Sequence, residues 1–229
     1  IRDVESFGML CSESELGLSE ESDGILILPP ETRLGKKVAK ILERDDIILD
    51  LSVTPNRGDC LSHWGIAREL ASALGRKLKE PSFQKLKWGA KKKSQSAQKI
   101  ALKLNAKNNG RQFFGCAIEG VQIQPSPKWI QKRLKAVGLR PINQVVDATN
   151  YVLYEFGQPT HAYDLDRLEG HRLSIDFASE GETLKLLDGS QVKLIQEDLI
   201  IRDSKKPVAL AGVMGGGNSE VLESTTRIY

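Results

Sequence analysis

The sequence is poor in residues that bind transition metals or form disulfides. Its three cysteines, Cys11, Cys60 and Cys116, lie far apart without a CxxC pair, and it has only three histidines. A structural zinc site needs about four such ligands at close spacing, and a disulfide framework needs cysteines in pairs. We therefore expect neither a metal site nor a disulfide framework, and reduced thiols favour a cytoplasmic protein.

Long apolar runs are also missing. The longest weakly polar run, residues 208–217, has ten residues and is rich in glycine. A membrane span needs about 20 apolar residues, so no membrane partner is expected. The chain opens on IRDVESFG, without an initiating methionine or the basic and apolar parts of a signal peptide. This opening predicts a fragment of a longer protein.

Charge is unevenly distributed along the 229 residues, although the formal net charge is only +3. Residues 76–111 contain twelve Lys or Arg against one acid, Glu80, so the rest of the chain is acidic. A basic segment of this kind can follow nucleic-acid phosphates. Within it, however, KKKSQSAQK has no apolar periodicity and equally fits a solvated connector.

The stretch around which the rest is arranged is RPINQVVDATNYVLYEFGQPTHAYDLD, residues 140–166. Its apolar residues recur at helical spacing, with Asn143 placed to cap the helix and Gly157 placed to end it. His161 follows on an irregular segment, and Asn150 lies two turns before the helix end. Such a place suits catalysis because a rigid element holds out polar side chains, although a lone histidine near an apolar stretch also fits simple packing.

The remaining pattern predicts several short strands and further helices. Helices are expected at residues 31–42, 61–74 and 126–138, the last capped by Ser126. Strands are expected at 24–29, 47–53, 100–104 and 173–177. Residues 183–194 are expected to form a hairpin of two strands, because Asp188-Gly189 between them is a strong hairpin signal. Further strands are expected in LIIRD, PVALAGVM and TTRIY, and within RQFFGCAIEGVQI. Many strands with interposed helices predict an α+β fold on a mainly antiparallel or mixed sheet.

The glycine-rich loop GVMGGGNS, residues 212–219, allows three interpretations. It lacks the Gly-Lys-Ser/Thr ending of a P-loop, and GxGxxG is absent as well, which disfavours nucleotide binding. It also fits a tight corner between strands. Alternatively, Gly212, Gly215 and Gly216 expose bare backbone on which a substrate lies.

Two motifs resemble one known family. GLRPINQVVDATNYVLYEFGQPTHAYDLDRL and the later PVALAGVMGGGNSEV are similar, in order and spacing, to the editing domain of the β subunit of bacterial-type phenylalanyl-tRNA synthetases. This resemblance implies the tail of a tRNA-binding OB-type barrel (1–29), a small α/β connecting domain (30–76) and an editing domain (99–229). The charge pattern, which the resemblance does not cover, adds a basic linker (77–98) between the last two parts. In the family, the chain continues after Tyr229 with an acidic residue and further pocket-forming chain, so the editing domain is expected to be truncated here.

The resemblance implies hydrolysis of the ester of tyrosyl-tRNA(Phe). His161 and Asn150 would be catalytic, with Arg140, Gly212, Gly215 and Gly216 binding the substrate. No GxSxG elbow or Cys–His signature is present, and an activated ester needs only a fixed carbonyl and an aimed water. ATP and Mg²⁺ would serve ligation in the parent enzyme and not this part.

The implied partners are the acceptor end of tRNA(Phe) and the catalytic α subunit of an α2β2 heterotetramer, and no DNA is expected. The alternative is a non-catalytic RNA-binding or subunit-docking module, in which the basic segment binds and His161 only packs.

Overall fold

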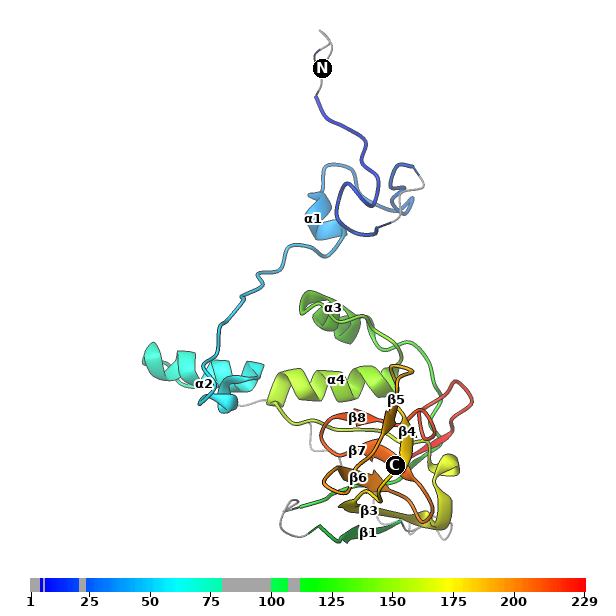
Figure 1. Ribbon diagram of the computed structural model, residues 1–229. Coiled ribbons are helices and arrows are strands. Elements are labelled where there is room, and N and C mark those ends of the chain that lie inside the picture. Colours follow the sequence, from blue (N-terminus) through cyan, green and yellow to red (C-terminus); the bar gives the residue numbers. More distant parts are fainter. Residues whose placement is uncertain (1–4, 6, 21–23, 80–99, 107–111) are drawn as a thin grey trace. The chain divides into compact units, whose positions relative to one another are not determined.

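The computed structural model describes residues 5, 7–20, 24–79, 100–106 and 112–229 (Figure 1). The chain divides into two compact units, Ile1–Ile47 and Ile48–Tyr229. The four expected part boundaries stay predictions, and most of the basic linker lies outside the described residues.

The first unit contains one short helix, α1 (Val38–Ile41), among its described residues. The longer helix expected at 31–42 is wrong, because Gly35 adopts φ +79° and interrupts helical backbone. The strand expected at 24–29 is also wrong: Leu26 N–H donates to the Cys11 carbonyl at 2.8 Å, but no ladder forms, and Ile27 is 85% exposed.

The second unit begins with an extended segment. Residues 47–53 form no strand, contrary to expectation, because no neighbouring strand pairs with them in the described part of the chain. A 3₁₀ turn, η1 (Gly58–Cys60), then leads into α2 (His63–Ala73). The Ser62 side chain caps α2 by accepting from Gly65 N–H at 3.0 Å. The helix expected at 61–74 is confirmed.

Two further helices follow, α3 (Lys128–Ala136) and α4 (Gln144–Phe156). Asn143 caps α4 by accepting from the N–H groups of Val145 and Val146, both at 3.0 Å, and Gly157 ends it in the left-handed conformation, as predicted. The predicted Ser126 cap of α3 is wrong, because the buried Ser126 hydroxyl donates to Asp147 of α4 instead.

The central sheet has the order β1-β3-β6-β7-β8. Only β1 and β3 run parallel, with Ala101 opposite Arg172, and the other neighbours are antiparallel. The predicted α+β fold with a mixed sheet is therefore confirmed. The strands are β1 (Ala101–Leu104), β3 (Arg172–Phe177), β6 (Leu199–Arg202), β7 (Pro207–Leu210) and β8 (Met214–Gly215).

Two small antiparallel pairs complete the second unit. The expected hairpin joins β4 (Thr183–Lys185) to β5 (Gln191–Lys193), with Gly189 at φ +86° in its turn. β2 (Ile118–Glu119) pairs with β9 (Arg227–Ile228), which confirms the strand expected near the end of the sequence. Two 3₁₀ turns, η2 (Leu165–Arg167) and η3 (Glu169–His171), lead into β3.

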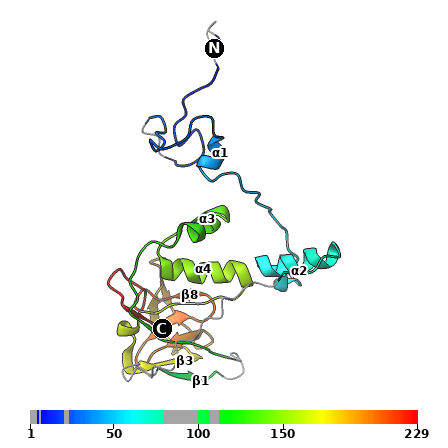
Figure 2. The same cartoon turned by 180° about the vertical axis from the view of Figure 1, so that it is seen from behind.

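Two apolar clusters hold the sheet together. One includes Leu173 and Val208 with residues of η2, and the other includes Leu184 and Ile200 beneath the β4–β5 hairpin. In both views of the second unit, α4 lies between α3 and the sheet (Figures 1 and 2). None of the described helices is long and apolar enough to cross a membrane.

Candidate active site around His161

His161 lies on the segment that leaves α4 and returns to the sheet. Just after it, Tyr163 pairs with Tyr229 through two backbone hydrogen bonds of 2.9 Å, and Asp164 N–H donates to the Ser219 carbonyl at 3.0 Å. Asp164 is buried, and its carboxylate accepts from Thr225 Oγ1 at 2.6 Å. These bonds fix the backbone on one side of His161, so the sheet determines where the imidazole lies.

The imidazole of His161 packs on the backbone of Gly215 in β8. A Cβ at Gly215 would lie 2.5 Å from Nε2 of His161, and also too close to Cε1. The Gly215 carbonyl accepts from Leu187 N–H at 3.1 Å, which joins β8 to the end of the β4–β5 hairpin. Glycine is therefore needed here for close approach, and two residues predicted from separate motifs lie in direct contact.

The ring of His161 also meets Tyr163 edge-on, with centroids 4.6 Å apart and an interplanar angle of 72°. Desolvation by this packing lowers the pKa of His161 below its usual value. Because more than a third of the residue is still exposed, water screens this effect and the ring can still reach solvent. The neutral imidazole is favoured near pH 7, with a nitrogen able to accept a hydrogen bond.

Tyr163 is a neighbour that the sequence reasoning missed. It is buried, its hydroxyl lacks a partner among the described residues, and burial strongly raises its pKa. The usable signal was its spacing, because residues two apart on an extended segment point to the same side.

The other two glycines have different surroundings. Gly212 is exposed at φ +73° in the β7–β8 turn, where Val213 N–H donates to the Leu210 carbonyl at 3.1 Å. This geometry matches the strand-corner interpretation of the loop. Gly216 is buried, and a Cβ there would lie 2.8 Å from the Val208 carbonyl oxygen and 2.9 Å from the Leu184 side chain. Gly216 is thus required by packing.

Arg140 and Asn150 lie on other elements. Arg140 is exposed in the α3–α4 connection, and Asn150 is half-buried within α4. In the part of the chain that the structure describes, no hydrogen bond, ion pair or ring contact joins either residue to His161 or Gly215. The structure therefore brings together His161 and Gly215 from the predicted set.

One group of potential metal ligands occurs among the described residues, formed by Asp59, Cys60 and Glu69 around α2. Arg57 already occupies it: its guanidinium lies 3.0 Å from Asp59, 2.6 Å from Glu69 and 3.1 Å from Cys60 Sγ. The hydrogen bond from Arg57 to Asp59, with the positive charges of Arg57 and Arg68, lowers the pKa of Asp59 to about 2. The group is an ion-pair cluster, with Asp59 exposed and Cys60 buried, that ties η1 to α2, and Arg57 bonds to all three of its members.

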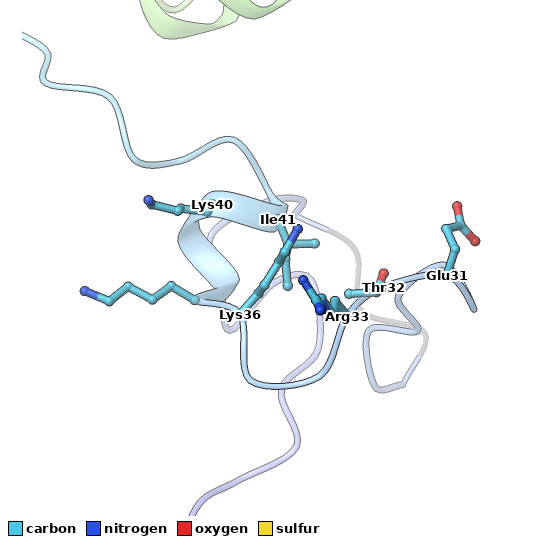
Figure 3. Close-up of a pocket in the computed structure, with 7 residues that line it drawn as sticks. Glu31, Thr32, Arg33, Lys36, Lys40 and Ile41 are labelled. Atoms are coloured by element: carbon cyan, nitrogen blue, oxygen red, sulfur yellow. The ribbon is translucent and has the colours of Figure 1, made fainter.

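The first unit has a pocket of about 690 Å³ around α1. Figure 3 shows Arg33, Lys36 and Lys40 among its lining residues, with Lys37 and Glu31 also contributing. The sequence reasoning did not single out these cations. The available signal was their spacing of three to four residues, which places side chains on one side of a helical turn.

Comparison with known proteins agrees with the two motifs. The B3/4 domain family matches residues 109–229. The chain is 46% identical over 228 residues to the phenylalanine–tRNA ligase β subunit of Anaeromyxobacter dehalogenans, and 47% identical over 232 residues to that of Oleidesulfovibrio alaskensis. Each alignment covers 100% of this chain and 28% of the relative.

Among solved structures, an N-terminal fragment of the phenylalanyl-tRNA synthetase β subunit from Pyrococcus horikoshii aligns with a TM-score of 0.42 and 15% identity. That alignment covers 76% of this chain and 51% of the other. The chain spans about 28% of the length of these two curated relatives. The predicted likeness to phenylalanyl-tRNA synthetase β subunits is confirmed, and since the B3/4 match takes in more than half of the sequence, the chain belongs to the B3/4 domain family.

Proposed function

We propose that this chain is the editing part of a phenylalanyl-tRNA synthetase β subunit and hydrolyses the ester of tyrosyl-tRNA(Phe). Family membership supports the setting. The observation that carries the proposal is the contact between His161 and Gly215, because it holds a neutral imidazole against bare backbone with one side open to water. A group held in this way can orient a nucleophile without forming a covalent intermediate.

Hydrolysis of an aminoacyl ester places modest demands on the site, because the ester is already activated. A neutral His161 nitrogen accepts a hydrogen bond from the attacking water or from the terminal ribose, and the lowered pKa keeps that nitrogen unprotonated. We assign Asn150 and Arg140 supporting roles in holding the substrate. Gly215 would shape the floor beside His161, with Gly212 in the turn before β8 and Gly216 at the packed position directly after it.

A second site is useful because an apolar pocket that selects phenylalanine rejects an added hydroxyl by only about 100-fold. An editing pocket that pairs with the phenolic oxygen can discriminate by about 10⁴ or more, since its buried polar group is left unpaired when phenylalanine enters. Selection in editing would thus depend on polarity.

Ligation is proposed for the whole synthetase, which would join phenylalanine to tRNA(Phe) with ATP and Mg²⁺ in the cytoplasm. The α subunit would be its partner in an α2β2 heterotetramer. No step of ligation is assigned to the residues of this chain.

The test uses the β subunit assembled with its α partner. Tyrosine release from tyrosyl-tRNA(Phe) and phenylalanine release from phenylalanyl-tRNA(Phe) are measured for the parent and for His161→Ala. We expect the variant to lose most tyrosine release while phenylalanine charging is unchanged. Equal tyrosine release by the variant would remove His161 from the mechanism.

The second candidate function is a non-catalytic RNA-binding or docking module. The observation that favours it is the basic surface of α3, where Lys128 and Lys135 are exposed. Steeply salt-dependent tRNA binding with no ester hydrolysis by the assembled enzyme would support this candidate and contradict editing.

A further inference from the structure

An exposed aromatic and cationic cluster lies where α3 packs on α4. Trp129 of α3 is 52% exposed and meets Tyr151 of α4 edge-on, with ring centroids 5.2 Å apart. The guanidinium carbon of Arg133 lies 5.4 Å from the Trp129 ring centroid and 5.7 Å from that of Tyr151. Arg133 also donates to the Tyr151 hydroxyl. These contacts fix the orientation of Trp129 while leaving about half of its surface open.

The same surface is strongly basic. Residues 126–140 contain five cations and no acid: Lys128, Lys132, Arg133, Lys135 and Arg140. No ion pair neutralises any of the five within the part of the chain that the structure describes. An acid, Glu155, interacts with Tyr151 of the cluster. In both views, α3 lies on the side of α4 away from the sheet, so the sheet does not cover it (Figures 1 and 2).

An ordinary solvated helix face would account for the lysines but not for a large aromatic ring held in the open. An aromatic side chain beside cations is the arrangement on which unpaired bases stack while the cations contact the phosphates. A duplex keeps its bases stacked on one another and offers no free base face. The charge and the ring together therefore select a single strand.

We propose that the α3 surface formed by Trp129, Arg133 and Tyr151, with Lys128, Lys132 and Lys135, binds an unpaired RNA strand by stacking one base on Trp129. This proposal rests on the proposed function in one respect: if the chain edits tyrosyl-tRNA(Phe), the unpaired strand is the 3′ end of that RNA. Binding itself does not require ester hydrolysis, so the two proposals can fail separately.

The test uses the full 229-residue chain and a fluorescein-labelled single-stranded 12-nucleotide RNA of mixed sequence, followed by fluorescence anisotropy at several salt concentrations. Trp129→Ala should weaken binding by roughly 5- to 100-fold, the range for removal of one base–aromatic stack, whereas Trp129→Phe should keep most of the affinity. Phe114→Ala removes another exposed aromatic, 81% exposed and outside α3 in the segment between β1 and β2, and should leave binding unchanged.

A double change, Lys132→Gln with Lys135→Gln, should reduce the slope of log affinity against log salt by about 1.4, or about 0.7 for each phosphate that the protein no longer neutralises. If Trp129→Ala folds poorly, binding is followed in a Trp64→Phe/Trp88→Phe background, in which RNA should quench the fluorescence of Trp129. Equal binding by Trp129→Ala and the parent would overturn the proposal. The proposal would also be overturned if Trp129→Ala weakened binding of an RNA duplex of the same length as much as it weakens binding of the single strand. Loss of binding only when Lys91, Lys92 and Lys93 are changed to Gln would overturn it as well.

Discussion

Replacing Gly215 with alanine should impair ester hydrolysis by moving His161. The new methyl group would lie 2.5 Å from Nε2 of His161, whereas carbon and nitrogen atoms in contact normally lie about 3.5 Å apart or more. The imidazole must therefore shift by about 1 Å. A misplacement of about 1 Å can reduce a rate by about 100-fold, so we expect a loss of that order in tyrosine release.

Stability should change little in this variant. The backbone at Gly215 is not in the left-handed region, and alanine at a compatible position gains about 0.4–1 kcal/mol through the unfolded state. This gain offsets two costs: displacement of the partly exposed His161 ring, and the close contact of 3.1 Å between the new methyl group and the Leu187 side chain. We expect the free energy of unfolding, measured with urea on the 229-residue chain, to stay within about 1 kcal/mol of the parent.

The rate assay uses the assembled synthetase and tyrosyl-tRNA(Phe) under single-turnover conditions, with phenylalanine charging as the measure of intact ligation. Gly217→Ala is the matched control, because its φ is not positive and a Cβ there would meet only two backbone oxygens, at 3.7 and 3.9 Å. Unchanged tyrosine release by Gly215→Ala, or an equal loss in Gly217→Ala, would refute the reasoning that Gly215 positions His161.

Four further outcomes are expected. The buried carboxylate of Asp203 accepts hydrogen bonds from the N–H groups of Glu169, Lys205 and Lys206 at 3.0, 2.7 and 2.9 Å. Asp203→Ala removes these bonds and should lower the free energy of unfolding in urea by about 2–4 kcal/mol. Asp203→Asn should lower it less. Asn143→Ala removes the α4 cap and should cost about 1 kcal/mol in the same assay; a neutral result would mean that the cap bonds are not maintained in solution. Tyr163→Phe removes a buried hydroxyl without a partner in the described part of the chain, so thermal unfolding should show equal or higher stability, and a large loss would reveal a missed partner. The pKa of His161 is lowered in the folded chain, so below about pH 6.5, the unfolded value, the unfolded chain binds more protons than the folded chain. The free energy of unfolding should therefore be fully retained above that pH and decrease below it, and His161→Gln should flatten this dependence on pH. Tyrosine release should fall at still lower pH, where His161 in the folded chain becomes protonated.

Much of the helical structure could be predicted because its signals are local. Asn143 and Gly157 bound α4 where the sequence placed them, and Asp188-Gly189 forms the expected hairpin turn. Each of these residues acts through its own backbone or a neighbour within a few positions. Such preferences do not depend on the rest of the chain.

The errors occur where the structure depends on a distant partner or on one glycine. Residues 47–53 have strand composition, but a strand needs a neighbour to pair with, and none of the described strands supplies one. Ser126 has the right type and position for a cap, but Asp147, 21 residues later, binds its hydroxyl. At residues 31–42, the positive φ of Gly35 overrides the helical spacing.

His161 and Gly215 could be proposed for the candidate site from the sequence, but Tyr163 was missed and the geometry of the site could not be predicted. His161 and Gly215 belong to different motifs and meet only because Tyr163 pairs with Tyr229 and β8 pairs with β7. The sequence could not show that the space above Gly215 is filled by the imidazole itself. Nor could it separate Gly215, which contacts His161, from Gly216, which packs under Leu184.

The most direct test of the central claim combines His161→Ala with Gly215→Ala in one assembled enzyme. If Gly215 acts by holding His161 in its working position, the double variant should release tyrosine from tyrosyl-tRNA(Phe) no more slowly than His161→Ala alone. If Gly215→Ala slows the His161→Ala enzyme as strongly as it slows the parent, the two residues act independently and the account is contradicted.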